Sequence, residues 1–75
     1  MKSISKNYQV LFGEFIREAR ERKGLNQTDA GELLGITQSY LSYLERGERE
    51  IDLALALRCC AALDVDMKDF IDKCM

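Results

Sequence analysis

The sequence contains no proline, no histidine and no tryptophan, and it has only five glycines and three cysteines among its 75 residues. Because proline is absent and glycine is scarce, little interrupts a helix, and the composition favours helices joined by short connections. Apolar residues make up 47% of the chain and charged residues 32%, which is typical of a globular protein and too apolar for a disordered one. We expect a single small domain over residues 1–75.

The cysteines and the lack of histidine argue against a metal site. Cys59 and Cys60 are adjacent and Cys74 lies near the end, so no C-x-x-C spacing exists and no fourth ligand completes a tetrahedral site. An odd cysteine count also suits a reducing compartment. We interpret Cys59 and Cys60 as small core residues and expect Cys74 to be open to oxidation, and we predict no metal and no other cofactor.

Long apolar runs and the usual catalytic groups are also missing. The apolar stretches are too short to span a bilayer, and no apolar signal core follows the N-terminal lysines, so we expect a cytoplasmic protein. Without histidine, a nucleophile beside a base, or a glycine-rich phosphate loop, we do not expect an enzyme. We also expect no separate domain that binds a small molecule.

The net charge of −2 differs from the strongly basic character expected of a nucleic-acid-binding protein. The charge is unevenly distributed: residues 1–23 carry a net +3, residues 24–50 a net −3 and residues 51–75 a net −2. Positive charge is therefore concentrated at the N-terminal end.

Apolar residues near the N-terminus recur at steps of three and four, the period of a helix. They predict a first helix over about residues 7–23 and are Tyr8, Leu11, Phe12, Phe15, Ile16 and Ala19. Gly24, Gly35 and Gly47 each follow a helical pattern, where a left-handed residue commonly ends a helix.

Two polar residues mark the starts of the next helices. Asn26 is expected to cap a second helix that ends at Leu34, and Thr37 a third helix over Gln38–Arg46. Asp29 suits the third position of a capping box with Asn26. A link of about three residues that contains glycine is typical of a helix-turn-helix.

The last third of the chain predicts two further helices. Asp52 is expected to cap a fourth helix that runs through Leu63, and Asp66 with Asp69 to open a short fifth. We expect three apolar residues of the fifth helix to face inward: Met67, Phe70 and Ile71. No useful length alternates with the period of a strand, so the predicted fold is all-α, a compact five-helix domain.

The third helix has an unusual outer face. Residues 35–48 read GITQSYLSYLERGE, and one side of the helix carries Gln38, Ser39, Ser42, Tyr43 and Arg46. Leu41 and Leu44 lie across from this stripe. The face is mostly neutral, aromatic and able to form hydrogen bonds, which suits contact with the edges of DNA bases.

Residues 24–47, GLNQTDAGELLGITQSYLSYLERG, resemble the helix-turn-helix of the phage repressor and Cro-type family, which is also called XRE-like or lambda repressor-like. The resemblance is specific because it combines Arg20, the Gly-x-x-Gln of 24–27, Gly35 and the Glu-Arg-Gly of 45–47. It covers nearly the whole chain, since LFGEFIREARERKGLNQ and ALDVDMKDFI are similar to the segments of the family on either side of the motif.

The resemblance implies roles for the polar residues of the motif, about residues 26–47. Gln38, Ser39 and Tyr43 fall where the family contacts bases in the major groove. Gln27, at the start of the second helix, and Arg46 fall at phosphate-contacting positions. Gln38 and Ser39 could instead be ordinary polar residues of the first turn, and Tyr43 could pack at the edge of the domain.

Three further charged residues take roles from the same resemblance. Arg49 is another candidate for a phosphate contact, and a solvated side chain explains it equally well. Arg20 and Glu45 match a buried ion pair between the first and third helices of the family, whereas an exposed pair would contribute little stability.

The sequence departs from the family pattern in the second and fourth helices. Ala30 and Gly31 replace a large apolar residue followed by alanine, so we expect Gly31 to face the turn and large neighbours to fill the space beside Ala30, namely Phe12, Phe15 and Tyr40. In the fourth helix, apolar residues replace charged ones on the outer face. We expect a homodimer, because one recognition helix reads only a few base pairs. The candidate interface is drawn from Ala54, Leu55, Ala61, Phe70 and Met75, and the alternative is a monomer in which Leu55 is a lone exposed apolar residue.

The resemblance implies a sequence-specific DNA-binding transcriptional regulator, whose partner is double-stranded DNA and whose helix 38–46 enters the major groove. The alternative is a protein-interaction module of the same fold that does not bind DNA. The net −3 of residues 24–50 favours this alternative, because it includes Asp29, Glu32, Glu48 and Glu50 near the presumed DNA side.

Overall fold

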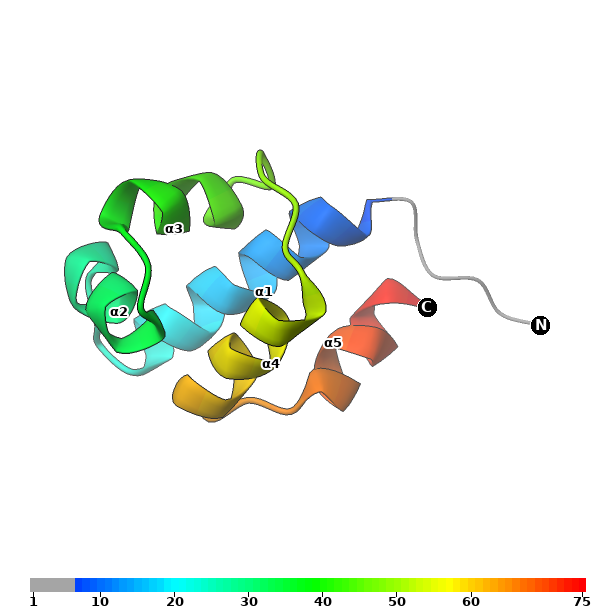
Figure 1. The fold of residues 1–75 in the computed structure, drawn as a ribbon. Helices are drawn as coiled ribbons and strands as arrows, with labels where there is room; N and C mark the ends of the chain where they lie inside the picture. The colour runs from blue at the N-terminus through cyan, green and yellow to red at the C-terminus, as the bar shows by residue number, and fades with distance from the viewer. Residues whose placement is uncertain (1–6) are drawn as a thin grey trace.

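The computed structural model describes residues 7–75 and, over this range, contains five helices and no strand (Figure 1). The helices are α1 (Tyr8–Arg22), α2 (Gln27–Leu34), α3 (Gln38–Glu45), α4 (Leu53–Ala62) and α5 (Met67–Cys74). The prediction of an all-α, five-helix fold is therefore confirmed. No helix in the described range is both long enough and apolar enough to cross a membrane.

The four predicted caps are present, and each satisfies a backbone N–H at the start of its helix. Asn26 accepts a hydrogen bond from the Asp29 amide at 2.7 Å, and Thr37 accepts one from the Tyr40 amide at 3.0 Å. Asp52 and Asp66 accept in the same way at the starts of α4 and α5. Such a cap contributes about 1 kcal/mol, so local chemistry fixes where these helices begin.

α1 runs through the centre of the molecule, with α3 along one edge and α4 and α5 along the opposite edge (Figure 1). Ile16 of α1, Leu41 of α3 and Cys59 of α4 are fully buried, so three helices meet at one core. The ring of Phe70 meets that of Phe12 edge-on, with the centroids 4.8 Å apart. This aromatic contact holds α5 against α1.

The inward side of α5 differs from the prediction at one residue. Phe70 is buried and Met67 packs partly against the core, as expected, but Ile71 is exposed. Cys74 takes the inward position instead. It lies four residues after Phe70, so the two side chains share one face of the helix, whereas Ile71 is turned about 100° from Phe70.

All three cysteines lie in the core as free thiols. Burial raises the pKa of Cys59 to about 11 and also raises the pKa values of Cys60 and Cys74. The interpretation of Cys59 and Cys60 as core residues is confirmed. Cys74, which we expected to be open to oxidation, is buried as well, so an oxidant reaches it only when α5 moves away from the core.

Two glycines allow backbones to approach closely around α3. A Cβ atom on Gly31 would lie 2.9 Å from the carbonyl oxygen of Ile36, so this glycine faces the turn, as predicted. A Cβ atom on Gly13 would lie 2.6 Å from the carbonyl oxygen of Glu45. The middle of α1 therefore touches the backbone at the end of α3.

We expect Gly13→Ala to lower the free energy of unfolding. Alanine is better than glycine in a helix by about 0.5–1 kcal/mol. Forcing a methyl group into a filled contact costs about 1–3 kcal/mol, and this larger effect should decide the sign. Urea denaturation measures the change, with Arg17→Ala at an exposed position of α1 as the control. A Gly13→Ala protein at least as stable as wild type would show that α1 and α3 separate there without cost.

Candidate functional site

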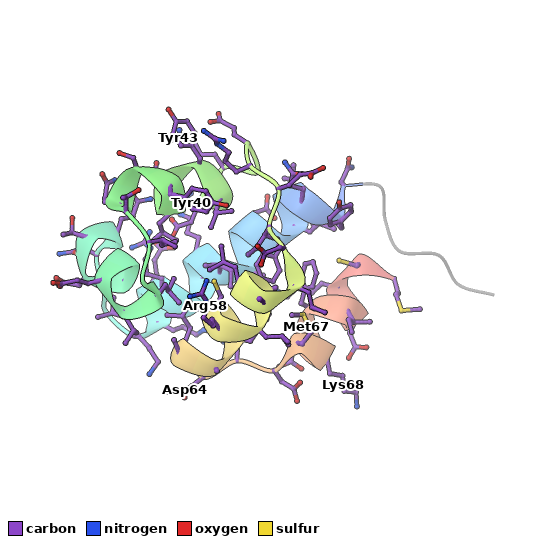
Figure 2. All side chains as sticks on the ribbon, viewed as in Figure 1. Tyr40, Tyr43, Arg58, Asp64, Met67 and Lys68 are labelled. Atoms are coloured by element: carbon purple, nitrogen blue, oxygen red, sulfur yellow. The ribbon has the colours of Figure 1, made fainter. Side chains whose placement is uncertain are left out.

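The predicted polar face of α3 lies on the surface. Five side chains line one open hollow of about 180 Å³, and they are Gln38, Ser39, Ser42, Tyr43 and Arg46. Leu41 and Leu44, on the other side of the helix, are buried in the core. Figure 2 shows Tyr43 pointing away from the body of the molecule and Tyr40 on the inner side of α3.

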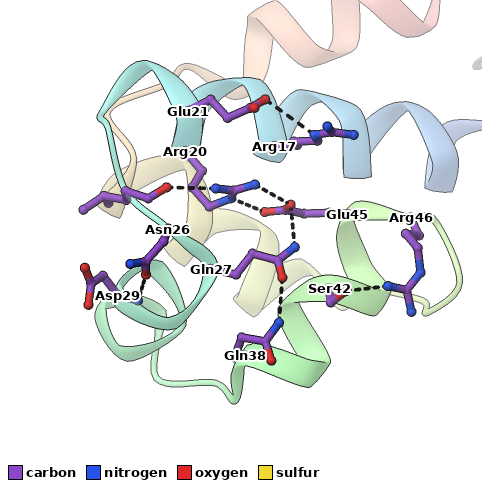
Figure 3. Close-up of polar contacts among 11 residues, drawn as sticks. Arg17, Arg20, Glu21, Asn26, Gln27, Asp29, Gln38, Ser42, Glu45 and Arg46 are labelled. Carbon is purple, nitrogen blue, oxygen red and sulfur yellow. Dashed lines mark hydrogen bonds and ion pairs between the residues drawn. The ribbon is translucent and has the colours of Figure 1, made fainter.

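Beneath this face, Arg20 of α1 and Glu45 of α3 form a two-pronged ion pair (Figure 3). Arg20 Nε donates to Glu45 Oε2 at 2.7 Å, and Nη2 donates to Oε1 at 3.0 Å. Nη1 donates to the carbonyl oxygen of Leu25 at 2.8 Å. The side chains are only 12% and 3% exposed, and the hydrogen bonds with Glu45 raise the pKa of Arg20. The pair thus links the end of α1, the loop after it and the end of α3.

Gln27 connects the ion pair to the surface. Its Nε2 donates to Glu45 Oε1 at 3.0 Å, and its Oε1 accepts from Gln38 Nε2 at 2.7 Å. A continuous chain of hydrogen bonds therefore runs from the largely buried Arg20 to Gln38 on the outer face (Figure 3). Sequence reasoning missed the contact between the two glutamines, because spacing along the chain does not show which side chains of α2 and α3 meet.

The other end of the face is organised around Tyr43. The guanidinium carbon of Arg46 lies 4.9 Å from the centre of the Tyr43 ring, and that of Arg49 lies 5.5 Å from it. Arg46 donates to Ser42 Oγ through Nη1 (Figure 3) and pairs with Glu48 at 3.1 Å. The structure therefore brings Arg49 to the same surface as Tyr43 and Arg46. Glu48 is a charged member of this group that sequence reasoning considered only as part of the net charge.

The proposed dimer residues need correction. Leu55 is 5% exposed and Phe70 is buried, so both belong to the core of the chain and are not free to meet a partner. Ala54, Ala61 and Met75 are exposed, as expected. The large apolar residues that α4 presents to solvent are Leu53, 72% exposed, and Leu57, 51% exposed. The sequence of α4 is apolar on nearly every side, so its pattern did not reveal which leucines face outward.

Comparisons with known proteins agree with this geometry. Residues 16–70 match a protein family described as Helix-turn-helix. The chain is 35% identical over 54 residues to the uncharacterized HTH-type transcriptional regulator YgzD of Bacillus subtilis, covering 72% of this chain and 82% of that protein. It is 29% identical over 70 residues to the control protein C.BamHI of Bacillus amyloliquefaciens, covering 92% and 86%.

A solved structure is similar in both fold and sequence. The crystal structure of the restriction-modification controller protein C.AhdI from Aeromonas hydrophila matches with a TM-score of 0.75 and 37% identity, covering 83% of this chain and 94% of that one. The relatives are thus named as regulators and controllers of the type that the sequence predicted, and none of these three is named as an enzyme.

We expect Arg20→Ala and Glu45→Ala each to lower the free energy of unfolding by about 3–5 kcal/mol, because each leaves an unpaired charge in a nearly buried place. Equilibrium denaturation measures the loss, and circular dichroism shows whether either variant is unfolded from the start. Arg17→Ala, which breaks the exposed pair with Glu21, is the control and should lose less than about 1 kcal/mol. Losses below about 1 kcal/mol for both core variants would contradict this account of the packing.

Proposed function

The chain belongs to the helix-turn-helix family, and from this membership we propose that it is a sequence-specific DNA-binding transcriptional regulator that inserts α3 into the major groove. The observation that carries the proposal is the exposed hydrogen-bonding face of α3 above the buried pair of Arg20 and Glu45. A face that enters the groove must offer donors and acceptors to base edges, and it must be held still. A cytoplasmic location is part of the proposal, because the three free thiols suit a reducing compartment.

Three residues of this face contact bases in the proposal. Gln38 can pair with adenine through both ends of its amide, and Ser39 can bond several bases. Tyr43 points outward and can meet a thymine methyl group with its ring edge. The bond that Gln38 donates to Gln27 favours one orientation of the Gln38 amide, which supports a role for Gln38 in choosing the sequence.

Phosphate contacts come from the two ends of the same surface. Gln27 lies in the first turn of α2, where backbone N–H groups favour an anion. Its amide nitrogen carries two hydrogens, and the bond to Glu45 uses one of them, so the second can reach a phosphate. Arg46 and Arg49 supply positive charge at the end of α3. Such contacts set affinity and register without choosing the sequence.

A homodimer is the second part of the proposal. One recognition helix covers only a few base pairs, and a two-fold dimer reads two half-sites about 34 Å apart. The exposed face of α4 carries Leu53, Leu57 and Ala61 at intervals of four residues, so they form one apolar stripe. Helix α4 lies across α1 from α3, so a second copy packed against its exposed stripe would leave the DNA face free (Figure 1).

We expect Gln38→Ala and Arg46→Ala to weaken DNA binding in different ways. Gln38→Ala should cost about 1–3 kcal/mol on the preferred site and little on random DNA. Arg46→Ala should weaken both by similar factors and flatten the salt dependence by about one unit of slope. The measurement is a selection of sites from random duplexes, followed by fluorescence anisotropy over a range of salt concentrations.

The same experiment decides between DNA binding and the alternative function. The net −3 of residues 24–50 favours a protein-interaction module, since acidic residues repel phosphates. If the selection enriches no sequence, and wild type binds no duplex even at low salt, the DNA-binding proposal fails and the α3 face serves a protein partner.

We expect Leu57→Glu to convert a dimer into a monomer, because a charge in an apolar interface is costly to desolvate. Sedimentation of wild type and variant at equal concentration measures the mass. Leu33→Glu is the matched control, since Leu33 is an exposed leucine on α2, outside the stripe. A wild type that stays monomeric at high concentration would contradict the dimer, and an unchanged mass for Leu57→Glu would exclude this face.

A further inference from the structure

Building on the DNA binding proposed above, we propose that Glu48 competes with DNA phosphates for Arg46 and so limits the affinity of the protein for DNA of any sequence. Glu48 carries the same charge as a phosphate and already occupies the guanidinium that the proposal assigns to phosphate binding. It is therefore a residue that acts on DNA through Arg46 rather than through a contact of its own.

The backbone places Glu48 beside Arg46. Gly47 has a φ of 72° and turns the chain back, and the Glu48 amide then bonds to the carbonyl oxygen of Tyr43 at 2.9 Å. Helix α1 fixes this turn, because Gln9 Nε2 donates to the Gly47 carbonyl oxygen at 2.8 Å. A Cβ atom on Gly47 would lie 2.8 Å from the Cα atom of Val10, so α1 fits closely against the turn. Glu48 thus projects from a held position and not from a loose loop.

The contact uses the part of Arg46 that best suits a phosphate. Glu48 Oε2 accepts from Arg46 Nε at 3.1 Å and lies 3.1 Å from Nη2. Neighbouring N–H groups of this kind form the fork with which arginine grips two phosphate oxygens. A phosphate that takes this edge must displace the carboxylate, since two anions cannot share it without repulsion.

Glu48 could in principle help binding by orienting Arg46, but the other contacts make this role unnecessary. Ser42 Oγ accepts from Arg46 Nη1, and the Tyr43 ring lies under the guanidinium. These two contacts remain when Glu48 is neutral, so Arg46 keeps its direction and loses only its competitor. Removal of the carboxylate should therefore strengthen DNA binding.

The expected size is modest because the pair is exposed, at 51% and 52% for the two side chains. Exposed ion pairs of this kind change an equilibrium by up to about fivefold. We expect Glu48→Gln to tighten binding about two- to fivefold, on preferred and random duplexes alike, because phosphate contacts carry no sequence information. The slope of log affinity against log salt should also steepen. In wild type, salt weakens both the DNA contact and the competing pair of Arg46 and Glu48, and these effects partly cancel, whereas in Glu48→Gln only the DNA contact is weakened.

The test measures duplex binding by fluorescence anisotropy for wild type, Glu48→Gln and Glu50→Gln at several salt concentrations. Glu50→Gln is the matched control: it removes the same charge two residues away, and Glu50 is likewise exposed. Glu48→Gln should exceed Glu50→Gln at low salt, and the difference should shrink as salt rises. Thermal unfolding of both variants should match wild type, since an exposed pair contributes little stability.

A double-mutant cycle with Arg46→Ala tests whether Glu48 acts through Arg46. In the Arg46→Ala background, Glu48→Gln should have no more effect than Glu50→Gln, because no guanidinium remains to compete for. Equal effects of the two glutamine variants in the wild-type background would overturn the proposal, and so would weaker binding by Glu48→Gln. If wild type itself binds no duplex at any salt concentration, the DNA-binding function is overturned. If wild type binds and the two glutamine variants change its affinity equally, only the role of Glu48 is overturned.

Discussion

The geometry of the α3 face depends on one interaction, the ion pair of Arg20 and Glu45. Burying two charges is costly, and the cost is offset only when each charge is also fully hydrogen-bonded. Here Leu25 and Gln27 supply the remaining partners, and no buried side-chain nitrogen or oxygen in residues 7–75 lacks one. A pair that tolerates so few arrangements fixes α1, the start of α2 and the end of α3 in one relative position. Close packing at Gly13 reinforces this constraint, because the two backbones touch directly beside Glu45.

From that constraint follows a division of the α3 face into two halves. The Gln38 end is connected through Gln27 to the buried charges, so its hydrogen-bonding direction is set from within the molecule. The Arg46 end is organised at the surface, by an aromatic ring, a hydroxyl and a nearby carboxylate. The first half suits the choice of bases, which needs fixed geometry, and the second suits phosphates, which need charge that can be exchanged. An acidic protein can bind DNA in this way because the local arrangement of charge matters more than its sum.

The sequence correctly predicted features that depend on residues close together along the chain. It failed for features that depend on how the helices pack against one another. Asn26, Thr37, Asp52 and Asp66 each cap a helix as expected, because a cap involves residues two or three positions apart. The outward stripe of α3 was equally clear, since polar and apolar residues separate by helical period. By contrast, Leu55 was assigned to the surface of α4 and Ile71 to the core, and both assignments were wrong. α4 is apolar nearly all round. In α5, Met67 and Ile71 are four residues apart, and so are Phe70 and Cys74, so spacing alone did not show which pair faces the core. The hydrogen bond between Gln38 and Gln27 joins two helices, and the residue pattern of neither helix predicts it.

Because all three thiols are buried, their reaction with an added reagent can measure how often the protein opens. A thiol reagent can reach Cys59, Cys60 or Cys74 only after the surrounding helices move apart, so the rate of labelling measures how often they do. Cys74 belongs to the last turn of α5 and would follow the fraying of that helix, whereas fully buried Cys59 would follow the opening of the whole core. The labelling rates of the natural cysteines thus measure local and global unfolding separately, and no cysteine has to be added. The logarithm of the ratio of the two labelling rates, each corrected for the reactivity of the free thiol, would give the free energy that separates loss of α5 from loss of the fold.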